Sequence, residues 1–194
     1  MEKTIINLTK AYLGECQARN RYTMFSKIAK KEGFEQISEI FLVTAEQERE
    51  HASWLFKLLN QLLEKKSEKF KTITTETEVD TVYGNTLENL ESAINGEKYE
   101  NTEMYPKFAE VAESEGLFDI SKRLKAIAIS EKHHEQRYTK LYENVKNNSV
   151  FKKEKKYYWI CRKCGYMEEG YKPPVECPSC GHSKNYFELE NENY

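Results

Sequence analysis

Apolar residues recur every three or four positions along four long segments of the first 146 residues, a spacing that predicts amphipathic helices. The expected helices span about 4–31, 36–65, 85–114 and 118–146. Gly33 and Gly116 leave only short turns inside the first and second pairs, so each pair should form an antiparallel hairpin. Between the hairpins, the Thr-rich stretch KSEKFKTITTETEVDTVYG is poor helix material and predicts a long extended crossover.

Each apolar stripe is interrupted near its middle by charged residues. The charged members are Glu15 in the first helix, Glu48 and His51 in the second, Glu97 and Glu100 in the third, and Glu131 and His134 in the fourth. In the third helix the expected buried stripe is Leu90, Ala93, Glu97, Glu100, Met104 and Val111. The second and fourth helices both place Glu-x-x-His in the stripe, and residues three apart share a helix face.

An internal repeat connects the two hairpins. KIAKKEGFEQIS (27–38) resembles EVAESEGLFDIS (110–121), and Glu48 and His51 match Glu131 and His134 at the same offset. Gly14-Glu15 matches Gly96-Glu97 at an offset one residue shorter, so the second copy carries one extra residue after Glu97. Such an insertion predicts a π-bulge that re-aims ligands in the third helix.

If the four stripes face one another, five carboxylates and two imidazoles meet in the core. Without compensation, such burial would cost more than the whole stability of a domain, about 5–15 kcal/mol. Lys and Arg do not occupy the stripes in matching number, so metal ions are the expected compensation. Oxygen-rich ligands with one His per metal suit iron or manganese better than zinc. The alternative for each motif alone is a solvated acidic helix face.

The pattern corresponds to ferritin-like di-iron bundles, in which two helices each supply one Glu and two supply Glu-x-x-His. Glu15 and Glu97 fill the first role, and Glu48/His51 and Glu131/His134 fill the second. Glu100 is a seventh candidate ligand. Tyr22 and Tyr105 lie near the ligands at helical spacing, either as core residues or as phenols that bond a ligand carboxylate or donate a proton.

The last part of the chain has its own cysteine pattern. Residues 147–156 are polar and predict a linker, so we expect domains at 1–146 and 157–194. The C-terminal domain is too small for a self-sufficient core and should be stapled by a metal. Its ligands would be the two Cys-x-x-Cys pairs, Cys161, Cys164, Cys177 and Cys180. Four thiolates alone leave zinc and iron open. Cys16 is expected to be an inert, partly buried thiol.

Composition narrows the function classes. Lys+Arg is 30 and Asp+Glu is 32, so the net charge of −2 gives no nucleic-acid signature. No apolar run reaches the length of a membrane span, and the N-terminus has no signal-peptide pattern, so a cytoplasmic protein is expected.

The motifs GECQARNRYTMF, EREH, EKHHEQRY and the C-terminal CRKC…CPSC together resemble the rubrerythrin family across nearly the whole chain. The resemblance implies an all-α ferritin-like four-helix bundle with a long crossover, followed by a small rubredoxin-like β/loop domain. It implies two non-haem iron ions in the bundle and one iron at the four cysteines. It also implies that Glu48 and Glu131 bridge the irons, and that Glu100 and His51 exchange on one iron as its oxidation state changes.

The family resemblance further implies a cytoplasmic peroxidase that protects anaerobes or microaerophiles from oxidative stress by reducing hydrogen peroxide. Glu100, His51, Tyr22 and Tyr105 are the expected catalytic residues. Electrons would come from an NAD(P)H-dependent rubredoxin reductase or free rubredoxin, and the chain would form a homodimer or higher homo-oligomer without nucleic acid or membrane. The alternatives are a ferroxidase or iron-storage protein, an oxygen reductase, and a structural zinc protein.

Overall fold

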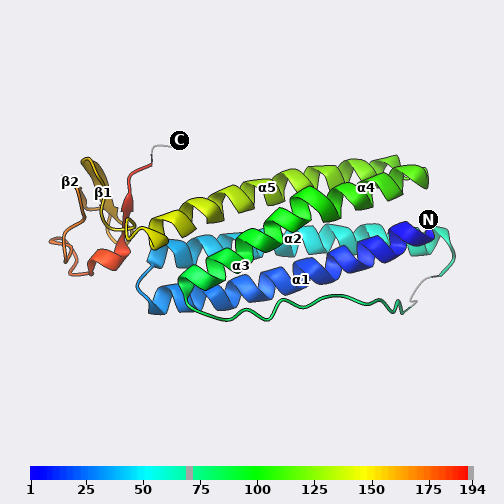
Figure 1. Cartoon of the computed structure of the whole chain (residues 1–194), viewed down its shortest axis with the longest axis horizontal. Coiled ribbons are helices and arrows are strands. Elements are labelled where there is room, and N and C mark those ends of the chain that lie inside the picture. The colour runs from blue at the N-terminus through cyan, green and yellow to red at the C-terminus, as the bar shows by residue number, and fades with distance from the viewer. Residues whose placement is uncertain (69–71, 192–194) are drawn as a thin grey trace.

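The computed structural model describes residues 1–68 and 72–191 and shows an elongated helical bundle with a small domain at one end (Figure 1). Helix α1 (Glu2–Lys31) and helix α2 (Glu35–Lys65) form the first hairpin. The second hairpin consists of α3 (Thr86–Tyr99), η1 (Glu100–Met104), α4 (Tyr105–Ser114) and α5 (Phe118–Lys146). The described part of the crossover, residues 72–85, runs as an extended segment along the outside of the bundle (Figure 1). The predicted helical fold with its long crossover is confirmed.

The helix ends follow local chemistry. Gly33 and Gly116 have φ values of +85° and +75°, which L residues with a Cβ rarely adopt, and they make the two tight turns. At the start of α3, the side chain of Asn85 accepts from the backbone N–H of Glu88, and the Glu88 carboxylate accepts from that of Asn85. This capping box fixes where the crossover ends and the second hairpin begins.

The third predicted helix contains a π-helical turn at η1, which confirms the expected bulge. The expected stripe is wrong beyond it, because Val111 is only partly buried while Tyr105, Ala109 and Ala112 are buried. A π-turn holds one residue more than an α-turn, so every later side chain is rotated relative to the earlier stripe. The bulge therefore turns Tyr105 into the core.

Two apolar clusters fill the bundle. One lies toward the N-terminus and includes Leu8, Leu55, Tyr105 and Leu124. The other lies toward the small domain and includes Tyr22, Phe25, Phe41, Leu90 and Tyr138. The predicted ligands fall between these clusters along every helix, so the polar centre is enclosed by apolar packing at both ends.

The C-terminal domain is an antiparallel three-stranded sheet. Strands β1 (Tyr157–Cys161), β2 (Met167–Gly170) and β3 (Phe187–Leu189) lie in the order β2-β1-β3, and the short helix η2 (Lys184–Tyr186) precedes β3. Its buried core is Trp159, Cys161, Cys177 and Phe187. The Trp159 indole donates to the Gly170 carbonyl at 2.9 Å. So small a core agrees with the predicted need for a metal staple.

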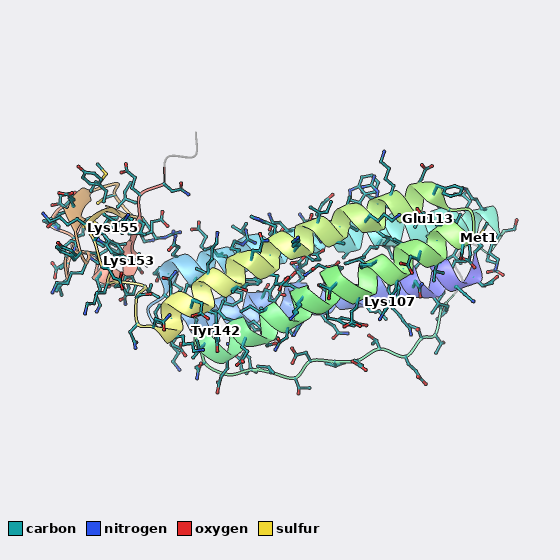
Figure 2. The ribbon with its side chains drawn as sticks, turned by 45° about the horizontal axis from the view of Figure 1, so that its top comes forward. Met1, Lys107, Glu113, Tyr142, Lys153 and Lys155 are labelled. Carbon is teal, nitrogen blue, oxygen red and sulfur yellow. The ribbon has the colours of Figure 1, made fainter. Side chains whose placement is uncertain are left out.

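The segment 147–156 packs against both units. On the bundle side, Phe151 stacks on Phe34 with ring centroids 6.3 Å apart, and the Lys153 side chain donates to Asn144 at 2.9 Å. On the side of the small domain, the Lys153 backbone N–H donates to the Tyr171 carbonyl at 2.8 Å. Figure 2 shows Lys153 and Lys155 beyond the end of the bundle where Tyr142 of α5 lies, whereas Met1 and Glu113 lie at the other end of the bundle. The domain limits at 146 and 157 remain a prediction, although α5 ends at Lys146 and β1 begins at Tyr157. Within the described ranges, no helix is long and apolar enough to span a membrane.

Candidate metal centres

The predicted bundle ligands converge in two groups at the centre of the helices. One group is Glu15, Glu48, His51 and Glu131, and the other is Glu48, Glu97, Glu131 and His134. In each group, one ligand atom from every member lies within 4.8 Å of the others. Glu48 and Glu131 belong to both groups, so they lie where two carboxylates could bridge two metal ions.

The carboxylates are buried with donor atoms left unpaired. Among described residues, Glu15 Oε2, Glu48 Oε1, Glu97 Oε2 and both oxygens of Glu131 are buried without a hydrogen-bond partner. Nδ1 of His134 lies 2.8 Å from Glu131 and 3.1 Å from Glu48, but neither contact has hydrogen-bond geometry. Unpaired buried acceptors around one point fit cations, and an oxygen-rich set with one imidazole in each group fits iron.

The pKa values of the buried carboxylates also indicate negative charge that the protein itself does not compensate. Burial, followed by the charges of Glu131, Glu100 and Glu48, raises the pKa of Glu15 well above its usual value. Burial and the charge of Glu48 raise the pKa of Glu97 to about 8. Carboxylates that resist ionisation here need positive charge to stay ionised, and two metal ions supply it.

The two histidines take up part of that role as cations. Burial would lower the pKa of His51, but its contacts with Glu131 at 2.9 Å and Glu48 at 3.1 Å raise it to about 9. Burial likewise opposes ionisation of His134, yet Glu131, Glu48 and Glu97 raise its pKa to about 12. Both imidazoles thus stand in for positive charge among the carboxylates.

Two buried tyrosines hold ligand carboxylates. The Tyr22 hydroxyl donates to Glu97 at 2.5 Å, and the Tyr105 hydroxyl donates to Glu15. Burial, then the nearby carboxylate charges, raises the pKa of both phenols well above the usual value, so both keep their protons. Both tyrosines therefore belong to the core clusters and also bond ligand carboxylates; proton donation by either one stays a prediction.

Glu100 stands apart from the two groups. It is the first residue of η1 and is only partly buried, and it is not a member of either four-residue group. Burial and the charges of Glu97, Glu131 and Glu48 raise its pKa well above normal, so its carboxylate is close enough to interact with the centre. His51, with a side chain 16% exposed, lies inside the first group.

The four cysteines form the second centre. Their sulfurs lie within 4.8 Å of one another, with Cys161 3.7 Å from Cys180 and Cys164 3.6 Å from Cys177. All four are free thiols. Gly165 and Gly181 take positive φ after each pair, but their own N–H groups donate to the carbonyls of Cys161 and Cys177 at 2.9 Å. The described fold thus supplies a four-thiolate metal site.

The residues that follow Gly165 and Gly181 donate backbone hydrogen bonds to cysteine sulfurs. The N–H of Tyr166 lowers the pKa of Cys164 to about 6 by hydrogen bonding. The N–H of His182 acts in the same direction on Cys180, but burial and the neighbouring thiols raise the pKa of Cys180 to about 12. The opposite shifts show that Cys164 and Cys180 differ in how readily they ionise, and a bound iron would favour the thiolate form of both.

Three ion pairs join residues that lie far apart in the sequence. Arg21 pairs with Asp80 of the crossover, and Arg162, next to a cysteine ligand, pairs with Glu39 of α2 and Glu188 of β3. Nothing in local sequence spacing predicts any of these pairs. Cys16 is partly buried, as expected.

Comparisons with known proteins agree with these centres. A family model described as Rubrerythrin matches residues 7–142, and one described as the rubredoxin-like domain of rubrerythrin matches residues 159–188. Rubrerythrin-1 of Clostridium acetobutylicum is 46% identical over 99% of this chain and 96% of its own length. The rubrerythrin of Nitratidesulfovibrio vulgaris is 42% identical over 99% of this chain and 96% of its own length.

Solved structures show the same architecture. Fully reduced nigerythrin matches with a TM-score of 0.63 and 29% identity, covering 96% of this chain and 86% of its own. A Desulfovibrio desulfuricans bacterioferritin, at 20% identity and a TM-score of 0.63, covers 76% of this chain and 82% of its own and shares the fold of the bundle. The ferritin-like assignment is therefore confirmed.

Proposed function

Because the chain belongs to the rubrerythrin family of di-iron oxidoreductases, we propose that it is a peroxidase that reduces hydrogen peroxide to water at the bundle centre. The observation that carries this proposal is the pairing of two redox-capable metal sites in one chain. A storage protein would need the bundle site but has little need of the four-cysteine domain as an electron source. The proposed setting is oxidative-stress defence in the cytoplasm.

The reaction is balanced as H2O2 plus two electrons and two protons giving two waters. Two ferrous ions held by Glu15, Glu48, His51, Glu97, Glu131 and His134 would supply one electron each. The two protons come from solvent, and side chains of the protein would pass them to the centre. Tyr22 and Tyr105 carry hydroxyl protons on ligand carboxylates, so they position Glu97 and Glu15 and are candidates for relaying protons to the centre.

Glu100 and His51 are proposed to exchange with the redox state. A carboxylate favours ferric iron, whereas a neutral imidazole is relatively better for ferrous iron. The structure supports this indirectly, since His51 joins Glu15, Glu48 and Glu131 while Glu100 stands outside either group. The arrangement corresponds to the ligand set that the hypothesis assigns to the reduced state. The π-helical turn at Glu100 gives that side chain a distinct direction.

Electrons are proposed to enter at the four-cysteine site from a rubredoxin-type partner or an NAD(P)H-dependent reductase. The small domain lies at one end of the bundle (Figure 1), whereas the carboxylate centre lies between the two apolar clusters. A homodimer that brings the four-cysteine site of one chain to the bundle centre of another would shorten the electron path, and we propose that arrangement.

The test is an anaerobic steady-state assay with NADPH, a rubredoxin reductase and the iron-loaded chain. One NADPH should be consumed per hydrogen peroxide, since both carry two electrons. Replacing peroxide by O2 should give much slower turnover, which separates the peroxidase from an oxygen reductase. NADPH oxidation that does not depend on peroxide, or iron deposition as the main outcome, would contradict the proposal.

A further inference from the structure

A pocket of about 690 Å³ lies between α1, the crossover and the π-helical segment. The outer wall is the extended segment 76–80, which runs beside α1 on the outside of the bundle (Figure 1). Glu100 lines the pocket, so the cavity reaches from the surface to a predicted ligand carboxylate. The other wall residues used below are Gly14, Arg21 and Gly96.

Two helix-interior glycines face this pocket from equivalent positions of the repeat. Gly14 directly precedes Glu15, and Gly96 directly precedes Glu97. Neither has positive φ. A Cβ at Gly14 would meet only Glu100 Oε1, at 3.8 Å, and a Cβ at Gly96 would meet only Arg21 Nη2, at 3.6 Å. Both distances are ordinary contacts, so neither backbone nor crowding requires glycine there.

Glycine inside a helix is less favourable than alanine, so Gly14 and Gly96 lower the stability of their helices although the helix geometry does not require glycine there. What both glycines provide is open space in the pocket beside Glu100 and Arg21. Longer side chains at either position would extend into that space. The shared position in the repeat places one glycine on each side of the passage.

The outer wall is held in place by a clamp centred on Asp80. The Ser92 hydroxyl donates to its carboxylate at 2.5 Å, the Val82 N–H donates at 2.9 Å, and Arg21 forms an ion pair with it. Arg21 also donates to Ser92 at 3.3 Å, which ties α1, α3 and the crossover together. These contacts hold the outer wall of the pocket against α1 and α3.

We propose that this pocket is the entry route for hydrogen peroxide, kept open by Gly14 and Gly96 and limited in width by the Asp80 clamp. The inference rests on the proposed function. Polar wall residues such as Lys10, Gln17 and Arg21 suit a small solute that donates and accepts hydrogen bonds. Hydroperoxides with a bulky organic group fit such a passage poorly.

The test fills the passage with leucine. Gly14→Leu and Gly96→Leu should lower the second-order rate constant for oxidation of the reduced chain by hydrogen peroxide at least tenfold, by stopped flow. Asn95→Leu is the matched control, because Asn95 is the exposed neighbour of Gly96 and does not line the pocket. Its rate constant should equal that of the parent. Equal rate constants in all four proteins would overturn the proposal.

Two further readouts do not depend on turnover. Melting of the metal-free variants should occur at or above the parent temperature, since leucine is a good helix former, so slow variants are not misfolded ones. Azide binding to the oxidised iron sites should also be at least tenfold slower in both leucine variants. If the parent does not react with peroxide but azide entry is slowed, the proposed function fails and the route stands. Unchanged azide entry would overturn the route.

The clamp is tested with Asp80→Ala. Releasing the wall should raise the rate constant for tert-butyl hydroperoxide, relative to that for hydrogen peroxide, severalfold above the parent ratio. If the ratio of the two rate constants in Asp80→Ala equals that of the parent, the wall does not limit entry.

Discussion

The bundle encloses its ligands between two apolar clusters. The C-terminal domain has a buried core of only four residues, Trp159, Cys161, Cys177 and Phe187. Two of those four core residues are themselves predicted ligands. In the bundle the metal ions would compensate buried charge inside a fold that apolar packing already holds. In the small domain the metal would replace the missing core. Bound metal would thus contribute little to the folding of the bundle and most of the folding of the small domain.

The sharpest way to break this comparison is metal removal. A chelator in denaturant-free buffer should unfold the small domain, because metal binding at such sites supplies about 10 kcal/mol or more of folding free energy. The bundle should keep its helices. Far-UV circular dichroism reports the helices, and Trp159 fluorescence together with the second tryptophan, Trp54, reports the loss of packing.

Cys177→Ser should reproduce the loss in the small domain alone, and Cys16→Ser serves as control because Cys16 lies outside the quartet. A small domain that stays folded without metal, or a bundle that loses its helices together with it, would show that the two regions do not differ as described.

Truncation after residue 148 separates the regions completely. The remaining bundle should keep its helical content and its iron centre, and should consume about one peroxide per reduced centre, by the two-electron count. Turnover with NADPH and a reductase should fall to background. The cut removes the contacts of Phe151 with Phe34 and of Arg162 with Glu39, so a modest drop in melting temperature is expected. Sustained turnover by the truncated chain would refute the assigned role of the small domain.

The two regions also differ in how much their sequences predict. The two Cys-x-x-Cys pairs lie within residues 161–180, so their spacing alone predicts the ligand set of the small domain. The bundle ligands are spread from Glu15 to His134, and only the apolar stripes and the repeat bring them together. In the structure the four cysteines converge, as do six of the seven predicted bundle ligands, whereas Glu100 lies outside both bundle groups.

What the sequence did not predict depends on long-range geometry. The π-turn was expected, but not the resulting rotation that buries Tyr105 and Ala109 in place of Val111. The Arg21–Asp80 pair joins residues whose separation reflects only how the crossover lies on the bundle. Such contacts follow from tertiary packing and leave no periodic signal in the chain.

Glu100→Ala sharpens the account of the bundle. Six predicted ligands remain, so both irons should stay bound, while peroxide turnover should slow about tenfold or more. Reduction of the four-cysteine site should be unaffected. Glu103→Ala is the matched control, since Glu103 is an exposed residue of the same π-turn and pairs with Lys107 at 3.0 Å. A parent rate for Glu100→Ala, or identical iron ligands in both redox states, would disprove the exchange.

A smaller effect is expected from pH on the metal-free bundle. The pKa of Glu97 is raised to about 8 and that of His51 to about 9. A group with a raised pKa binds more protons folded than unfolded, so its stabilising contribution is lost as pH rises through that pKa. The melting temperature of the metal-free bundle should therefore fall by several degrees between pH 5 and pH 9.

The iron-loaded bundle should change less over that range, because the ligands are then held ionised or neutral by the metal. Differential scanning calorimetry of the truncated chain, with and without iron, measures both curves. A gap between them that narrows as pH rises would contradict a buried carboxylate cluster.

The most direct test of the peroxidase assignment is an anaerobic titration of the fully reduced, iron-loaded chain with hydrogen peroxide, followed in the visible band of the four-cysteine site. Each chain holds two electrons at the bundle centre and one at the cysteines, and each peroxide accepts two. The band should return in full at about 1.5 equivalents of peroxide per chain, because the cysteine iron refills the bundle centre. A band that stays bleached while peroxide is consumed would contradict electron flow from the small domain to the bundle.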